Sequence, residues 1–272
     1  QATVGVWPFV NGPHQWTPGT HKFFGWLVND VNGTENDLSD DLNPASLFGN
    51  TFTCVTDTDK NVTMAEFKPE TKTLSIPATT ISQTSPQFDF MYSNVVSTEP
   101  QVDPVDLTFS HLFSAFRITG LNRVATNNIT ITNITISGLH NKQSASINFA
   151  GEGPVVPVVT YTDSGEDGTF EFTFTGNDGV LSTEVKDLTT TYLIWPQASA
   201  NFDDAKIVVY YTYTKDGQVT NEERELTLES QDAWNAGKIN NINLVFDVKQ
   251  ITFYIEELVA WSSEEKDIHV QM

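Results

Sequence analysis

Apolar and polar residues alternate with a period of two through much of this chain, and that pattern restricts what it can fold into. The segment "TFEFTFT" (169–175) puts three phenylalanines on one face and a glutamate and threonines on the other. The segment "IVVYYTYT" (207–214) alternates in the same way. Successive side chains point to opposite faces only in an extended strand, so each segment is predicted to be a β-strand with one buried face.

The connections between these segments are typical of β-proteins. "KDGQ" (215–218) contains an Asp-Gly pair, a strong hairpin signal, and "ERELTL" (223–228) is the expected return strand. "NITITNITIS" (128–137) changes phase halfway, which predicts a bulge near Thr132–Asn133. "SGEDG" (164–168) is interpreted as a hairpin turn. No segment carries a sustained helical periodicity, so the predicted fold class is all-β.

The chain has 272 residues, enough for one large β domain or two ordinary ones. A change in texture at "VSTEPQVDPVD" (96–106), where two prolines bracket acidic and polar residues, predicts a domain boundary. We therefore expect an N-terminal β domain over residues 1–103 and a C-terminal β domain over residues 104–272.

The segment "DLTFSHLFSAFRI" (106–118) fits two patterns. Phe109, Leu112, Phe113 and Phe116 have the spacing of a helix face. Leu107, Phe109, His111 and Phe113 instead share one face of a strand, and the all-β context favours that interpretation.

Net charge argues against two classes of partner. The chain has 35 acidic and 14 basic residues, a formal charge of −21, which repels nucleic acid and anionic lipid. No stretch of 18 consecutive apolar residues is present, so no transmembrane segment is expected. The opening "QATVGVWPFV" has neither a basic region nor an apolar core, so an export signal would already have been removed.

Motifs for catalysis or metal binding are weak. The histidines are scattered and Cys54 is the only cysteine, so a zinc site has little support. Asp57–Asn61 begins like a calcium loop, but Val62 and Lys68 stand where glycine and glutamate are needed. Asp163-Ser164-Gly165 matches the aspartic-protease tripeptide, but it occurs only once. No enzyme, metal or other cofactor is predicted.

Aromatic residues gather near the N-terminus: Trp7, Trp16 and Trp26, with Phe23 and Phe24. Core packing is the commoner use of such a cluster. The alternative is a platform on which sugars stack.

Several segments, taken in order, resemble the fimbrillin family of bacterial pilus subunits. They are "FDFMYSNVVS" (88–97), "PVDLTFSHLFSAFRITG" (104–120), "YLIWPQ" (192–197), "WNAGKINNINL" (234–244) and "ITFYIEELVAW" (251–261). His111 falls on the histidine of the family's strand pattern. The resemblance therefore implies that His111 is a packed or hydrogen-bonded strand residue at the start of the second sandwich, and not a catalyst.

The resemblance also implies two transthyretin-like β-sandwich domains in tandem and a lipoprotein precursor exported through the periplasm. Its expected location is the cell surface, in a fimbrium associated with the outer membrane. Assembly would proceed by donor-strand exchange. In that process an N-terminal strand is removed by proteolysis, and a strand of the next subunit fills the groove. Other fimbrial subunits are thus the expected partners, with surface glycans or proteins of host or bacterium as further candidates.

The end of the chain offers candidate residues for strand exchange. Ile251, Phe253 and Ile255 share one strand face, and Trp261 closes the segment. Residues 251–261 would span roughly 36 Å at about 3.3 Å per residue, enough to complete an open sheet. The alternative is that this segment is the last strand of its own domain.

The sequence thus predicts a structural or adhesive subunit of a surface fimbria. The alternative is a surface carbohydrate-binding β-sandwich protein that uses the N-terminal tryptophans or the acidic loops. A hydrolase would need a cleft with paired carboxylates, which no motif indicates.

Overall fold

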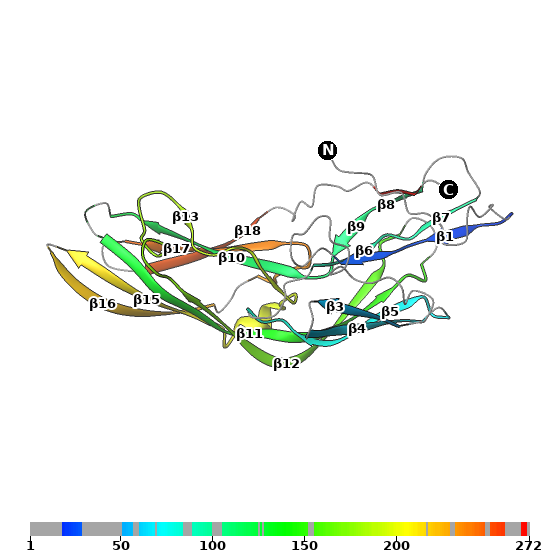
Figure 1. Cartoon of the computed structure of the whole chain (residues 1–272), viewed down its shortest axis with the longest axis horizontal. Helices are drawn as coiled ribbons and strands as arrows, with labels where there is room; N and C mark the ends of the chain where they lie inside the picture. Colours follow the sequence, from blue (N-terminus) through cyan, green and yellow to red (C-terminus); the bar gives the residue numbers. More distant parts are fainter. Residues whose placement is uncertain are drawn as a thin grey trace.

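The computed structural model of the chain describes residues 18–28, 51–56, 60–68, 70–83, 89–99, 105–124, 126, 128–151, 155–215, 217–228, 232–247, 251–258 and 268–270. Regular structure in these ranges is β-strand, apart from one short 3-10 turn, η2 (Ser199–Phe202). The all-β prediction is therefore confirmed. The described elements form an elongated body, with β16 at one end and β1 at the other (Figure 1). In these ranges no helical segment has the length and hydropathy needed to span a bilayer.

The largest sheet has seven strands, in the order β16-β15-β11-β5-β4-β3, with β12 also paired to β11. Its strands are β3 (Thr51–Thr56), β4 (Lys60–Lys68), β5 (Thr73–Thr80), β11 (Asn128–Asn148), β12 (Val158–Thr173), β15 (Lys206–Lys215) and β16 (Gln218–Thr227). β15 and β16 form the predicted hairpin, with φ of +78° at Gly217.

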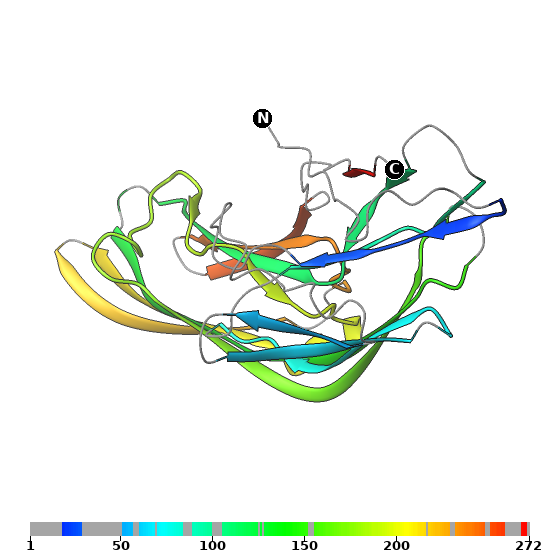
Figure 2. The ribbon, with the colours of Figure 1, turned by 45° about the vertical axis from the view of Figure 1, so that its right-hand side comes forward.

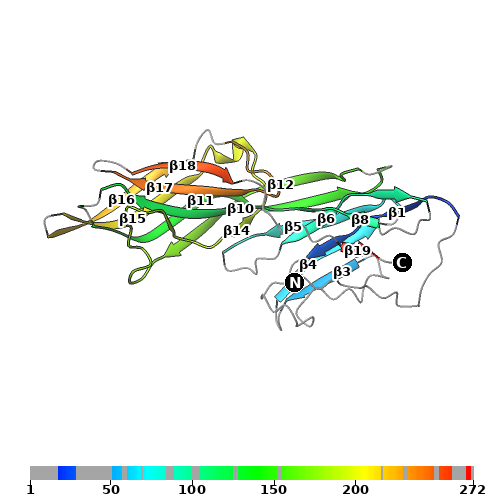
Figure 3. The ribbon, with the colours of Figure 1, turned by 90° about the horizontal axis from the view of Figure 1, so that it is seen from above.

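Smaller sheets face this one. A five-stranded sheet contains β10 (Ser114–Asn122), β13 (Lys186–Asp187), β14 (Tyr192–Ile194), β17 (Ile239–Phe246) and β18 (Ile251–Leu258). A three-stranded sheet contains β2 (Trp26–Val28), β6 (Phe90–Ser93) and β9 (Phe109–His111). Two pairs complete the set: β1 (His21–Phe23) with β7 (Val96–Thr98), and β8 (Val105–Leu107) with β19 (Ile268–Val270). Seen from above, β10, β17 and β18 lie over the β15–β16 half of the large sheet (Figure 3).

The 21-residue strand β11 runs the length of the large sheet. Along one edge it pairs with β12; along the other it pairs first with β15 and then with β5. The register with β15 shifts between Ile131 and Asn133, which confirms the predicted bulge. Figure 2 shows β11 and β12 curving together beneath the smaller sheets.

The segment "SGEDG" is not a hairpin turn; that interpretation was wrong. Residues 158–173 form one strand, β12, whose register on β11 jumps from Lys142↔Glu166 to Gln143↔Asp163. Ser164 and Gly165, with φ of +67° at the glycine, are therefore extra residues in a bulge. The acidic and glycine residues of this segment are typical of turns, but here they form a bulge that lets β11 and β12 bend together.

Two hydrophobic clusters lie between the sheets, one toward each end. The first joins β10 and β17 to β11, β12 and β15, and includes Phe116 and Phe170, whose ring centroids are 5.1 Å apart. In β12, Phe170 and Phe172 are buried while Glu171 and Thr173 are exposed, as the alternation predicts. The second cluster joins β5, β6 and the other half of β11, and includes the fully buried Trp195.

The segment 106–118 is extended, as predicted, but it is not one strand. β9 pairs with β6, whereas β10 pairs in parallel with β17, and the chain bends between them at Leu112–Phe113. The helical interpretation is wrong, because Leu112 N–H donates to Phe90 O and Ala115 N–H donates to Lys238 O instead of to their own segment. The boundary expected after residue 103 stays a prediction.

Gly138 lies at a register shift of β11, where its φ is +80°. A Cβ at this position would lie 2.6 Å from Asp204 O and 2.8 Å from Ala205 Cα, both backbone atoms. Glycine is required here for two reasons: the left-handed backbone, and the close approach of the chain that follows η2.

We expect Gly138→Ala to lower the free energy of unfolding by roughly 3 kcal/mol, measured by urea denaturation, because the left-handed backbone and the clash both oppose a Cβ. The control is Gly176→Ala. Gly176 also has a positive φ, +57°, but has open space around it. Its cost should be only about 1 kcal/mol, and equal losses in the two variants would contradict the clash.

Candidate functional site

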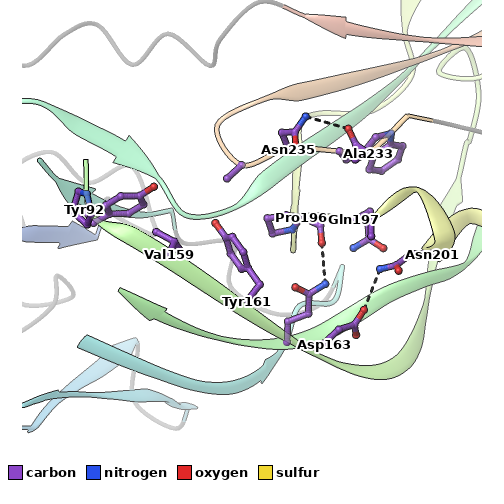
Figure 4. Close-up of a pocket in the computed structure, with 14 residues that line it drawn as sticks. Tyr92, Val159, Tyr161, Asp163, Pro196, Gln197, Asn201, Ala233 and Asn235 are labelled. Carbon is purple, nitrogen blue, oxygen red and sulfur yellow. Dashed lines mark hydrogen bonds between the residues drawn. The ribbon is translucent and has the colours of Figure 1, made fainter. Parts of the chain in front are cut away.

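A pocket of about 630 Å³ lies between the two hydrophobic clusters and is the candidate site (Figure 4). Its walls come from elements far apart in the sequence. Tyr92 of β6 and Trp234, just before β17, belong to different clusters. The centre of β12 contributes Tyr161 and Asp163, and the segment after β14 contributes Gln197. Sequence patterns alone could not have joined these residues, because the curvature of the sheets brings them together.

Gln197 holds the segment after β14 in place, and its side chain is almost fully buried. Its Nε2 donates to His140 O and to Trp195 O, both at 2.8 Å, and its Oε1 accepts from His140 N–H at 3.0 Å. Its backbone exchanges two hydrogen bonds with Trp234. Because every one of these bonds satisfies a buried group, this wall of the pocket is rigid.

A second buried amide supports the same wall. Gln143 of β11 is 2% exposed, and its Nε2 donates to Pro196 O at 2.9 Å. Beneath it, Trp195 Nε1 donates to Thr79 O at 2.8 Å and so ties the segment to β5. The pocket is therefore supported by side chain to backbone bonds that tie its wall to β11 and β5.

Asp163 lies at the rim of the pocket, beside the bulge of β12. Its Oδ2 accepts hydrogen bonds from His140 Nδ1 and from Asn201 Nδ2, and its Oδ1 accepts from Gly165 N–H. Burial alone would raise the pKa of Asp163. The hydrogen bonds from His140, Gly165 and Asn201 and the attraction of His140 outweigh burial, so the pKa lies below its usual range.

The tyrosines of the pocket keep their protons at neutral pH. Burial raises the pKa of Tyr161 strongly, and the neighbouring Tyr92 raises it further. Burial also raises the pKa of Tyr92. The Tyr161 hydroxyl donates to Leu112 O at 2.9 Å, which fixes its ring against the bend between β9 and β10.

Few of the described residues that line the pocket are acidic. Asp163 is the one carboxylate among the described residues that line the pocket, and its oxygens already accept three hydrogen bonds. The protease tripeptide thus contains a residue of the pocket rim, not half of a carboxylate pair. Within the described ranges, no cluster of three histidine, cysteine or acidic side chains could hold a metal ion.

His111 is 8% exposed in β9, where it pairs with Met91 of β6. Its Nδ1 lies 2.5 Å from Asp89 Oδ2, and Asp89 is also buried. The interpretation of His111 as a packed, hydrogen-bonded strand residue is confirmed. β9 pairs with β6 and precedes the bend that leads to β10, and the expected place of His111 at the start of a second sandwich stays a prediction.

None of the candidate strand-exchange residues that the structure describes lines this pocket. Residues 251–258 form β18, which pairs with β17 from Phe246↔Ile251 to Ile239↔Leu258. Ile255 is half-buried against the first hydrophobic cluster. For Ile251 and Phe253 the structure gives the backbone pairing, and Trp261 lies outside the described residues.

Some of the aromatic residues near the N-terminus lie in the described part of the chain and some lie outside it. Trp26 and Phe24 pack on the buried ring of Phe149, with centroids 6.3 Å and 4.7 Å from it, as expected for core residues. Trp7 and Trp16 lie outside the described residues, as does Asp57–Asp59 of the calcium-like segment.

We expect His111→Gln to lower the free energy of unfolding by about 1–2 kcal/mol, because it disturbs a buried hydrogen bond. A thermodynamic cycle with Asp89→Asn measures the coupling. The double variant should lose less stability than the sum of the two single changes, since each single change leaves a buried polar partner behind. Strictly additive losses would contradict a direct pair.

Asp163→Asn should be less stable than the parent at pH 7, by about 1 kcal/mol or less because the carboxylate is partly exposed. A lowered pKa in the folded state stabilises the protein above the unfolded-state pKa of about 3.9, and this contribution is lost as pH falls through the folded-state value. The difference between variant and parent should therefore shrink below about pH 4, measured by thermal melting at a series of pH values.

The control for this series is Asp178→Asn, a carboxylate on the exposed turn after β12. Its stability should follow that of the parent throughout. If the stability difference between Asp163→Asn and the parent stays constant from neutral to acid pH, the carboxylate charge is not what stabilises the rim.

Comparison with known protein families gives a match over most of the chain. The model of a family described as fimbrillin-like matches residues 50–257. No curated protein sequence matches the chain.

Solved structures include distant likenesses. A fimbrial protein from Bacteroides vulgatus is 12% identical, with 90% of this chain and 94% of that one covered and a TM-score of 0.37. A "putative cell adhesion protein" from Bacteroides uniformis is 15% identical, with 88% and 91% covered and a TM-score of 0.38. The assignment rests on the family model alone, and by that match the chain belongs to the fimbrillin-like family.

Proposed function

We propose that this chain is a structural or adhesive subunit of a bacterial surface fimbria. The observation that carries the proposal is its membership of the fimbrillin-like family over residues 50–257. A non-enzymatic role agrees with the pocket, where one carboxylate, already hydrogen-bonded, is the sole acidic side chain among the described lining residues. Other fimbrial subunits are then its partners.

The proposal extends to where the protein works. We place it in a fimbrium at the cell surface, associated with the outer membrane, after export through the periplasm as a lipoprotein precursor. A net charge of −21 suits this role, because it disfavours adhesion to anionic lipid before the subunit is built into a fibre.

We further propose that the fold consists of two transthyretin-like sandwich units in tandem. The presence of two hydrophobic clusters supports the division. The predicted boundary after residue 103 would lie just before β8, and the bend at Leu112–Phe113 is where the chain leaves the β6–β9 sheet for β10. β11 and β12 would then be strands that both units share.

Strand exchange is the proposed mode of assembly, with residues 251–261 as the donor and Ile251, Phe253, Ile255 and Trp261 as its contact residues. β18 suits a donor because it ends the described path of its sheet and holds to it through β17. Release of β18 breaks its backbone hydrogen bonds to β17, and an equal number of backbone hydrogen bonds can form with a strand of the next subunit. Main-chain bonds would supply affinity, and the alternate apolar side chains would fix the register.

The cost of release explains why a donor strand would stay in place until a partner arrives. Leaving β17 would expose the backbone groups of Ile239–Phe246 and remove Ile255 from the first hydrophobic cluster. Unpaired backbone groups and exposed apolar surface both oppose the open state. A free edge would also pair with other chains, so premature release would favour aggregation.

The test is a disulfide that locks β18 to β17. Val245 and Thr252 are directly opposite in this ladder, at a spacing that a disulfide can bridge. In a Cys54→Ser background, Val245→Cys with Thr252→Cys should enter surface fibres when reduced. When oxidised it should stay monomeric, because the donor cannot leave. Electron microscopy and immunoblotting of surface fibres measure the outcome.

A lock elsewhere provides the control. Thr212→Cys with Asn221→Cys joins directly opposite residues of β15 and β16 in the other sheet, and should assemble whether oxidised or reduced. If the oxidised β17–β18 lock assembles as well as the reduced form, residues 251–258 are not the donor. If neither form assembles while the control does, the substitutions themselves block assembly. In that case the same strand is tested by comparing Ile255→Asp, at a half-buried position of β18, with Tyr254→Asp, at an exposed one.

A further inference from the structure

We propose that the pocket between the two hydrophobic clusters binds a neutral saccharide unit. This inference does not rest on fimbrial assembly, since it concerns residues 92–236 and not β18. Three properties of the lining support a saccharide: its size, its mixture of rings and amides, and its charge.

The size suits a small ligand. A volume of about 630 Å³ falls within the usual range for ligand-binding pockets. The walls are preformed, because Gln197, Gln143 and Tyr161 are each held by a hydrogen bond to a backbone carbonyl. A ligand would therefore lose little affinity to ordering of these walls.

The rings supply apolar contact. Tyr92 and Tyr161 approach from β6 and β12, and Figure 4 shows both side chains at the same end of the pocket. The indole of Trp234 is almost fully buried and forms part of the base. The C–H face of a sugar ring is apolar and its rim is polar, so it matches a lining that combines aromatic rings with amides.

Amides dominate the polar side of the pocket. Asn201 Nδ2 donates to Asp163, which orients the Asn201 side chain at the rim. Asn235 is exposed at another part of the rim, where its Nδ2 makes a long contact of 3.4 Å with Ala233 O. An amide carries both donors and acceptors, as a hydroxyl does, so these side chains suit a ligand with many hydroxyl groups.

The charge of the lining and of the whole chain favours a neutral ligand. Among the described lining residues no lysine or arginine is present, and the chain carries a net charge of −21, so phosphate, sulfate and acidic sugars are disfavoured. Asp163 has little to offer a cation, because His140, Asn201 and Gly165 already donate to its oxygens. A neutral, hydroxyl-rich ligand remains.

The test is saturation-transfer NMR on the folded chain. The probes are glucose, galactose, mannose, fucose, N-acetylglucosamine and N-acetylgalactosamine, with inorganic phosphate and putrescine as charged comparisons. At least one neutral sugar should give a signal. Ala198→Trp, at the exposed edge of the pocket, should abolish it by filling the space. Asn235→Ala should weaken binding about fivefold through the loss of a hydrogen bond.

Asn221→Ala, an exposed asparagine of β16 outside the pocket, is the matched control and should bind like the parent. If Ala198→Trp fails to fold, Asn235→Ala against Asn221→Ala decides. The inference is overturned if no sugar of the panel binds, or if sugar binding survives unchanged in both pocket variants. It is also overturned if phosphate or putrescine is the probe that the pocket variants lose. None of these outcomes bears on strand exchange.

Discussion

One constraint organises the molecule: β11 must serve both hydrophobic clusters. It extends over 21 residues, roughly 70 Å at about 3.3 Å per residue, and one strand of that length cannot stay flat beneath two separate cores. The register shifts at Ser137/Leu139, His140/Lys142 and Lys142/Gln143 fall where its partner on one edge changes from β15 to β5. The bend of the large sheet lies there, and Gly138 at φ +80° allows the chain after η2 to approach it.

The pocket is a consequence of that bend. Where β11 and β12 curve, their main chains cannot satisfy every backbone group by pairing, and side chains take over. Gln197 bonds to both backbone groups of His140, and Gln143 reaches Pro196 O. The bulge at Ser164–Gly165 turns Asp163 toward His140. These polar groups leave a hollow between the clusters, because apolar side chains that would fill it belong to one core or the other.

The sequence predicts the local structure well and the long-range structure poorly. Phe170 and Phe172 are buried as the alternation requires, the β15–β16 hairpin forms, and the slip at Ile131/Asn133 is present. These features depend on neighbours in the sequence. The segment "SGEDG" misleads, because the residues that favour a turn also favour a bulge, and only the partner strand decides between them. Asp163 belongs to a chance match to the protease tripeptide, and its actual partners, His140 and Asn201, lie 23 and 38 residues away.

Assembly and ligand binding would act on different parts of this fold. β18 ends a sheet that faces the β15–β16 half of the large sheet, whereas the pocket lies over the bend of β11 and draws its walls from both clusters. Exchange of β18 changes what covers β17, whose Ile242 and Leu244 lie in the first cluster beside Phe116 and Trp234. Trp234 also forms part of the base of the pocket and is bonded to Gln197 through its backbone. If an incoming donor strand restored the contacts that Ile255 of β18 makes with the first cluster, the pocket would stay intact. Under the proposed strand exchange, a subunit in a fibre would then keep its proposed ligand-binding site.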